Sequence, residues 1–166
     1  MAKHDFPLTN VTSLPTGPAI AADYNGLRPV NVYAPAGTAR RADRERFFTS
    51  ELPALFYATF QSVLLSGDFN CVLHPTDTTG PFTTSRALSE VRGLALSDAW
   101  SQDPQRPVYT HYSPNGATRI DRFYFTQDVL LRKTGIEILP VAFTDHNAVV
   151  LRLPVPTVGT GWRRGR

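Results

Sequence analysis

Apolar residues along this chain fall into short runs separated by polar turns, and most of these runs predict strands. The central run, Val63 to Leu65, is aliphatic and leads into Gly67, as expected for a buried strand that ends in a turn. Two earlier runs predict strands at 19–22 and 27–33, joined into a hairpin by the turn-forming pair Asn25-Gly26. Later runs predict strands at 108–112, 117–125, 136–141 and 148–153.

Helical periodicity is confined to three stretches. Residues 39–60 place large apolar side chains on one side, and Pro53 divides the stretch into two short helices, the second with Ser50 as its N-cap. A further helix is predicted to start at Thr84 or Ser85 and to end near Gly93, and a short one covers 126–131. The first stretch also carries arginines that we expect on a solvated face, with phosphate contact as the alternative: Arg40, Arg41, Arg44 and Arg46.

Composition and length indicate a single domain. The chain has 166 residues, of which 42% are hydrophobic, which is enough for a sizeable core. We expect residues 1–18 to be loop-like, 19–153 to form the domain, and 154–166 to be a linker-like tail. A net charge of +3 permits polyanionic partners without demanding them.

Cysteine usage and hydropathy limit the compartment. Cys71 is the single cysteine, which excludes an internal disulfide framework and a cysteine-built zinc site. No apolar run approaches the length of a membrane span, and the first residues lack the apolar segment of a signal peptide. The sequence therefore predicts an intracellular protein, in the nucleus or cytoplasm, that is not secreted.

Polar side chains stand at several predicted strand ends. After Gly67, strand alternation directs Asp68 and Asn70 to one side and Phe69 into the core. A carboxylate beside an amide in such a place is suited to hold a metal, a water or a phosphate. The alternative is a loop in which both residues bond their own backbone. The other polar positions of this kind are Asn31 with Tyr33, Arg119 with Asp121, and Asp145 with His146, whereas His111 alone is more typical of a strand surface.

Six short motifs in a fixed order carry a family resemblance. They are Asn31–Pro35, Gly67–Leu73, Leu96–Trp100, Tyr109–Ser113, Arg119–Tyr124 and Thr144–His146. Together they resemble the endonuclease/exonuclease/phosphatase superfamily, and more closely the apurinic-type endonuclease domain of LINE-like, non-LTR retrotransposons, over residues 17–153. The resemblance implies an α/β fold: a partial four-layer α/β/β/α sandwich of the DNase I type, with its first strands and helix missing.

The resemblance also implies a role for each polar residue. His146 would contact the scissile phosphate or exchange a proton with it, and Asp121 would orient the imidazole. Asp68 would activate or position the attacking water, and Asn70 would donate to a phosphate oxygen. The other implied site residues are Tyr33 as a phosphate contact, Asp145 near a divalent metal, and Asn31 and Arg119 as substrate-binding residues.

One part of the family pattern has no counterpart in this sequence. The family carries a metal-binding glutamate on a strand before the tyrosine strand, but the acids before Tyr33 are only Asp5 and Asp23. We therefore interpret the chain as a truncated domain that binds Mg²⁺ or Mn²⁺ weakly, because such sites already use few carboxylates. Apolar surface left bare by the missing strands would favour self-association.

The function implied is a metal-dependent DNA endonuclease that nicks target DNA for retrotransposition, weakened or inactive in this chain. Its expected partners are DNA and the reverse transcriptase of the element's polyprotein, with no membrane. One alternative is a non-catalytic remnant or weak DNA-binding module. Another is a phosphatase or lipid phosphodiesterase of the same superfamily.

Overall fold

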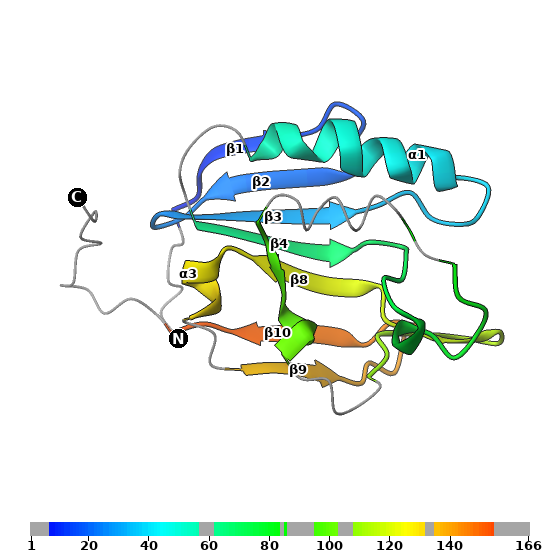
Figure 1. Ribbon diagram of the computed structural model, residues 1–166. Coiled ribbons are helices and arrows are strands. Elements are labelled where there is room, and N and C mark those ends of the chain that lie inside the picture. Colours follow the sequence, from blue (N-terminus) through cyan, green and yellow to red (C-terminus); the bar gives the residue numbers. More distant parts are fainter. Residues whose placement is uncertain are drawn as a thin grey trace.

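A six-stranded mixed sheet forms the centre of the computed structural model, which describes residues 7–56, 62–83, 85, 95–102, 108–131 and 135–154 (Figure 1). Within the sheet β3 and β4 are parallel, and every other neighbouring pair is antiparallel. In spatial order the strands are β1 (Thr9–Ser13), β2 (Ala19–Asp23), β3 (Leu27–Tyr33), β4 (Ser62–Asp68), β8 (Asp121–Phe125) and β5 (Ser97–Asp98).

Helical turns cover one face of this sheet. They run without interruption through α1 (Arg41–Arg46), η1 (Phe47–Glu51) and η2 (Leu52–Leu55). Phe47 and Phe48 are almost completely buried and form one core with Val30 and Leu65 of the sheet. Burial of these large apolar side chains is the main stabilising contribution of this layer.

Two details of the helical stretch differ from the predictions. Pro53 lies in the first turn of η2 as expected, but the residue before that turn is Glu51, and Ser50 lies inside η1 rather than capping a new helix. Arg44 is buried instead of solvated, because its guanidinium donates hydrogen bonds of 2.7 Å to the carbonyl oxygen of Pro35 and 3.1 Å to that of Gly37.

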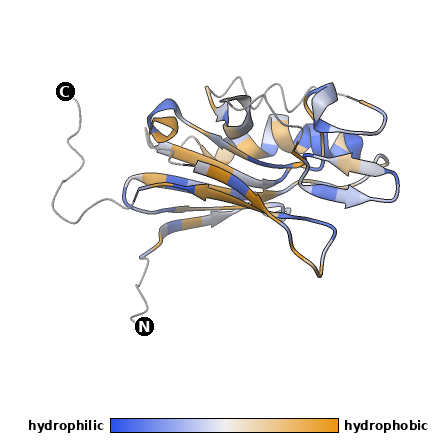
Figure 2. Ribbon diagram, turned by 90° about the horizontal axis from the view of Figure 1, so that it is seen from below, coloured by the Kyte–Doolittle hydropathy of each residue, from blue (hydrophilic) through white to orange (hydrophobic). Residues whose placement is uncertain are grey.

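A smaller second layer lies over the other face. Strands β9 (Gly135–Leu139) and β10 (Ala148–Arg152) form an antiparallel pair, and β10 contacts β8. Phe125 and Val129 are buried here, with Ile136 and Leu151 packed against them. The short helix α3 (Gln127–Leu130) follows β8, and the hydropathy view shows hydrophobic residues gathered along the strands (Figure 2). The layering is that of the predicted partial sandwich.

Several predicted strand boundaries are confirmed and others are wrong. The hairpin turn at Asn25 and Gly26 is confirmed, with φ of 47° and 78°. Residues 9–13, predicted within a loop-like segment, form the edge strand β1. The strand predicted at 117–125 is divided, because β7 (Gly116–Thr118) pairs with β6 (His111–Ser113) while β8 pairs with β4.

Other predictions concern residues that the structure does not describe. The helix predicted between Thr84 or Ser85 and Gly93 falls almost wholly outside the described residues, as does the tail from 155 onward. None of the helices in the described ranges has the length and apolar character that a bilayer crossing requires.

Gly67 allows β3 and β4 to approach closely at the ends that carry Tyr33 and Asp68. Its φ is +131°, and a Cβ at this position would lie 2.0 Å from the carbonyl oxygen of Val32. Only glycine fits this combination of backbone conformation and contact. The close approach sets Asp68 directly opposite Tyr33 in the parallel register of the two strands.

Candidate active site at the strand ends

The ends of β4 and β8 bring together side chains that are far apart in the sequence. Asp68 and Asp121 are direct partners in the antiparallel register. The Oδ2 atom of Asp121 lies 2.9 Å from Nδ1 of His146. One possible ligand atom from each of Asp68, Asp121 and His146 lies within 4.8 Å of the others. The predicted convergence of these three side chains is therefore present in the fold.

A buried threonine holds the loop that carries His146. The Oγ1 atom of Thr110 accepts a hydrogen bond of 3.0 Å from the backbone N–H of Asp121, and its carbonyl accepts one of 2.7 Å from Asn147. Next to it, the N–H of Tyr112 donates to the carbonyl of Asp145 over 2.9 Å. Because one residue contacts both the strand of Asp121 and the loop of His146, their relative position is fixed by the backbone.

Asn70 donates two hydrogen bonds within the protein. It has a φ of +50°, its N–H donates to Oδ1 of Asp68 over 2.8 Å, and its Nδ2 donates to the carbonyl of Ala34 over 2.8 Å. Asp68 thus accepts from the local backbone, as the loop alternative predicts, whereas the Asn70 side chain donates to a carbonyl 36 residues earlier. A role of the pair in holding a metal, a water or a phosphate stays a prediction. Phe69, between them, is fully buried as predicted.

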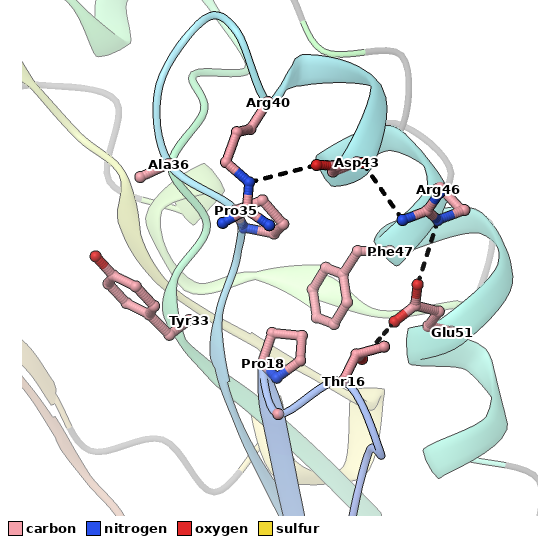
Figure 3. Close-up of a pocket in the computed structure, with 11 residues that line it drawn as sticks. Thr16, Pro18, Tyr33, Pro35, Ala36, Arg40, Asp43, Arg46, Phe47 and Glu51 are labelled. Atoms are coloured by element: carbon pink, nitrogen blue, oxygen red, sulfur yellow. Dashed lines mark hydrogen bonds and ion pairs between the residues drawn. The ribbon is translucent and has the colours of Figure 1, made fainter.

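Tyr33, which is opposite Asp68 in the strand register, is one of the residues that line a groove (Figure 3). The side chain of Tyr33 is 64% exposed, and Asn31 is exposed two residues earlier on the same strand. The groove has a volume of about 620 Å³. None of the three clustered residues lines it, and Tyr33 is its one predicted site residue. The groove is lined by Thr16, Gly17, Pro18, Tyr33, Pro35, Ala36, Arg40, Asp43, Arg46, Phe47 and Glu51.

The charges in this groove neutralise one another. Asp43 pairs with Arg40 and with Arg46, each over 3.3 Å, and Arg46 also lies 3.5 Å from Glu51 (Figure 3). The arginine side chains are more than 60% exposed, so these are surface pairs that water and salt screen. These ion pairs therefore contribute little to the stability of the fold, and the arginines can exchange partners at little cost in free energy.

Arg119 does not lie at the site. It is buried, its Nε donates to Oδ1 of Asp77 over 2.9 Å, and its guanidinium lies 5.6 Å from the ring centre of Trp100. Asp77 is completely buried and also pairs with Arg122. The structure does not bring Arg119, predicted as a substrate-binding residue, together with the cluster, because its guanidinium belongs to an internal ion-pair network.

His111, which was predicted to lie on a strand surface, is close to the site. Its ring centre lies 4.8 Å from that of His146, and its Nε2 lies 3.5 Å from Oδ2 of Asp145. A backbone bridge between His111 and His146 brings them together. No spacing rule reveals such a pairing, since it depends on where two distant segments meet.

The electrostatics of the site favour a cation. Burial raises the pKa of Asp68, the N–H of Asn70 lowers it, and the neighbouring charge of Asp121 raises it again. Two facing carboxylates in a partly buried place repel each other unless a proton or a cation is shared between them. The oxygens of Asp68 and Asp121 are the hard ligands that Mg²⁺ and Mn²⁺ prefer, so the residues present fit such an ion.

The mixed sheet carries at its strand ends an Asp–Asp–His cluster with the donor atoms that could hold a divalent ion. The chain belongs to the Endonuclease/Exonuclease/phosphatase family, whose sequence profile matches residues 6–146. It is also 31% identical over 138 residues to the Transposon TX1 uncharacterized 149 kDa protein of Xenopus laevis. That alignment covers 76% of this chain and 10% of the relative, so the chain spans about a tenth of that protein.

Solved structures share the fold at low sequence identity. An AP endonuclease from Archaeoglobus fulgidus superposes with a TM-score of 0.78 at 18% identity, covering 90% of this chain and 72% of that one. A 3′ phosphatase from Neisseria bound to a product DNA hairpin gives 0.78 at 19% identity, with the same coverage. A 3′-5′ exonuclease from Neisseria meningitidis gives 0.77 at 20% identity, covering 88% and 71%. The predicted superfamily, its α/β fold and the transposon resemblance are thereby confirmed.

Proposed function

We propose that this chain is a divalent-metal-dependent phosphodiesterase that nicks DNA, acting as the endonuclease part of a retrotransposon polyprotein inside the cell. The observation that supports it most directly is the Asp68, Asp121 and His146 cluster, with the imidazole 2.9 Å from its carboxylate partner. The transposon relative favours the polyprotein context, with reverse transcriptase as partner. The neighbour bound to a DNA hairpin favours a nucleic-acid substrate.

The chain's own groups have the chemistry that phosphodiester hydrolysis needs. The reaction requires an activated water in line with the leaving oxygen and neutralisation of charge on the phosphate. Asp68 is the direct strand partner of Asp121, and its carboxylate would position the attacking water. Asp121 occupies Nδ1 of His146 and leaves Nε2 to donate to a phosphate oxygen. Tyr33, exposed beside Asp68, would contact the same phosphate, with Asn31 and Asn70 around it.

The metal would be held mainly by carboxylates. Asp68 and Asp121 would supply oxygens to Mg²⁺ or Mn²⁺, and the exposed carboxylate of Asp145 is the next nearest candidate. When bound, the ion would neutralise negative charge on the phosphate. Among the described residues, neither group of metal-type side chains at the site contains a glutamate. We therefore propose that binding is weak and that nicking is slow, in keeping with the few ligands available.

A plasmid-nicking assay tests this function. Supercoiled DNA is incubated with the chain and Mg²⁺ or Mn²⁺, in parallel with His146→Ala, Asp121→Asn and the control His74→Asn, which alters a histidine outside the cluster and keeps a capping side chain. We expect slow, metal-dependent nicking in the wild type and control, and loss of at least roughly a hundredfold in the two site variants, the usual scale for acid–base groups.

The assay also separates the alternatives. Nicking that survives His146→Ala would show that the activity does not come from this site. No nicking with either metal, together with retained DNA binding, would contradict the proposal and favour the non-catalytic DNA-binding module. Faster release of phosphate from a 3′-phosphorylated oligonucleotide than nicking of plasmid would favour a phosphatase.

A further inference from the structure

A second group of metal-type side chains shares His146 with the carboxylate cluster. It consists of His111, Asp145 and His146, whose possible ligand atoms, one from each residue, lie within 4.8 Å of one another. His111 starts β6, and the other two follow one another in the loop before β10. We propose that these three residues form a separate site for a borderline divalent ion of the zinc type.

The contacts around each imidazole prepare it for metal binding through the same nitrogen. The Nδ1 atom of His146 lies 2.9 Å from Oδ2 of Asp121, and that of His111 lies 3.1 Å from Oγ1 of Thr118. Each ring therefore keeps Nε2 as its remaining ligand atom. Metal-binding histidines commonly have one nitrogen held by a carboxylate or another oxygen while the opposite nitrogen binds the ion.

The spacing of two of the three ligands already suits zinc. Zinc–nitrogen and zinc–oxygen bonds of about 2.0–2.1 Å in a tetrahedron place neighbouring ligand atoms about 3.3 Å apart. The Nε2 atom of His111 is already 3.5 Å from Oδ2 of Asp145. The Asp145 side chain is 65% exposed, so it can move the remaining distance without disturbing the core. Three protein ligands leave a fourth position for water.

The donor set distinguishes this site from the neighbouring carboxylates. Two imidazoles and one carboxylate suit zinc and its neighbours among the transition metals, whereas Mg²⁺ prefers oxygen ligands throughout. Cys71 does not compete as a soft ligand, because it is buried and burial raises its pKa to about 12. We thus expect a preference for Zn²⁺ over Mg²⁺ at His111, Asp145 and His146.

Occupation of this site has a consequence for the proposed hydrolysis. An ion at Nε2 of His146 would take the nitrogen that the proposed mechanism offers to the phosphate. Zinc would then oppose cleavage. The site itself depends only on the placement of its three ligands, so its binding can be measured without DNA and independently of any nicking.

Calorimetric titration with Zn²⁺ tests the proposal on the whole chain. We expect one saturable site in the wild type and in the His74→Asn control, and an affinity lower by more than roughly a hundredfold in His111→Ala and in Asp145→Asn. Thr118→Val removes only the outer partner of His111 and should cost roughly ten- to a hundredfold. Co²⁺ in place of Zn²⁺ gives a visible spectrum that reports tetrahedral coordination in the wild type.

Three results would overturn the proposal. The first is an absence of saturable Zn²⁺ binding in the wild type. The second is unchanged affinity in both His111→Ala and Asp145→Asn, with circular dichroism showing that the variants are folded. Binding of Mg²⁺ as tightly as Zn²⁺ would also contradict it, because nitrogen ligands would then give no selectivity.

Discussion

Replacing Asp77 by asparagine tests the buried ion-pair network behind the site. Asp77 is completely buried and accepts hydrogen bonds from Arg119, from Arg122, and from the N–H groups of Leu73 and His74. Asparagine keeps the shape but removes the charge, so the two buried guanidinium groups lose their shared counter-ion. We expect the free energy of unfolding to fall by about 3–5 kcal/mol, the cost of breaking a buried pair from one side.

The size of this loss is decisive because small domains have a total stability of only about 5–15 kcal/mol. Denaturant unfolding followed by tryptophan fluorescence is the measurement, since Trp100 lies against Arg119. Asp43→Asn is the matched control: it removes a carboxylate that pairs with arginines at the exposed surface and should cost less than about 1 kcal/mol. Equal losses in the two variants would refute the claim that burial makes the Asp77 network important.

The stability difference between the wild type and Asp77→Asn should depend on pH. Burial by itself would raise the pKa of Asp77, but Arg122 and Arg119 outweigh it and hold the pKa below its usual range. A carboxyl with a lowered pKa in the folded state stabilises the fold above its unfolded pKa of about 3.9. The advantage of the wild type over Asp77→Asn should therefore be full at neutral pH and shrink as the pH falls below about 4. A difference that grows with acid would reverse the sign of this reasoning.

Three further substitutions test other parts of the structure. Asp68→Asn should stabilise the fold at neutral pH, because the raised pKa of Asp68 means its charge is unfavourable there, and should abolish nicking; thermal melting checks it. Gly67→Ala should cost roughly 2–6 kcal/mol from φ strain and the clash with Val32, against roughly 1–2 for Gly37→Ala, which has positive φ and open space; denaturant midpoints compare them. We propose that the exposed edge strand β1, on which Val11 is 60% exposed, mediates self-association, and Val11→Lys should then reduce the concentration dependence of sedimentation in analytical ultracentrifugation.

The strands were predictable where one face is buried. β3 has the predicted ends, because its burial alternates strictly and a two-residue turn with positive φ precedes it. β1 escaped prediction for the opposite reason: all five of its residues are exposed, so no alternation of apolar and polar residues marks it. Backbone pairing and a hydrogen bond from Asn10 to Asp23 hold it to β2, and both depend on the partner strand.

Alternation also explains why Arg119 lies in the interior although Asp121 lies beside His146. The sequence puts both on one face of a single strand from 117 to 125. The chain instead leaves one sheet after Thr118 and enters another at Asp121, which breaks the alternation between them. Arg119 therefore turns inward to Asp77, and Asp121 alone reaches the imidazole. The convergence with His146 was implied by family resemblance, since spacing carries no information on it.

The division of charge along this segment determines what the site can bind. Arg119 and Arg122 are buried with Asp77 and Asp98, and the two arginines balance the two aspartates inside the protein. The described side chains at the strand ends are different in kind, since Asp68, Asp121 and Asp145 there meet two histidines. A phosphate approaching these carboxylates is repelled unless a cation is present. The proposed DNA cleavage is therefore expected to depend on a metal ion, because the fold directs both of the segment's arginines inward and its aspartate outward.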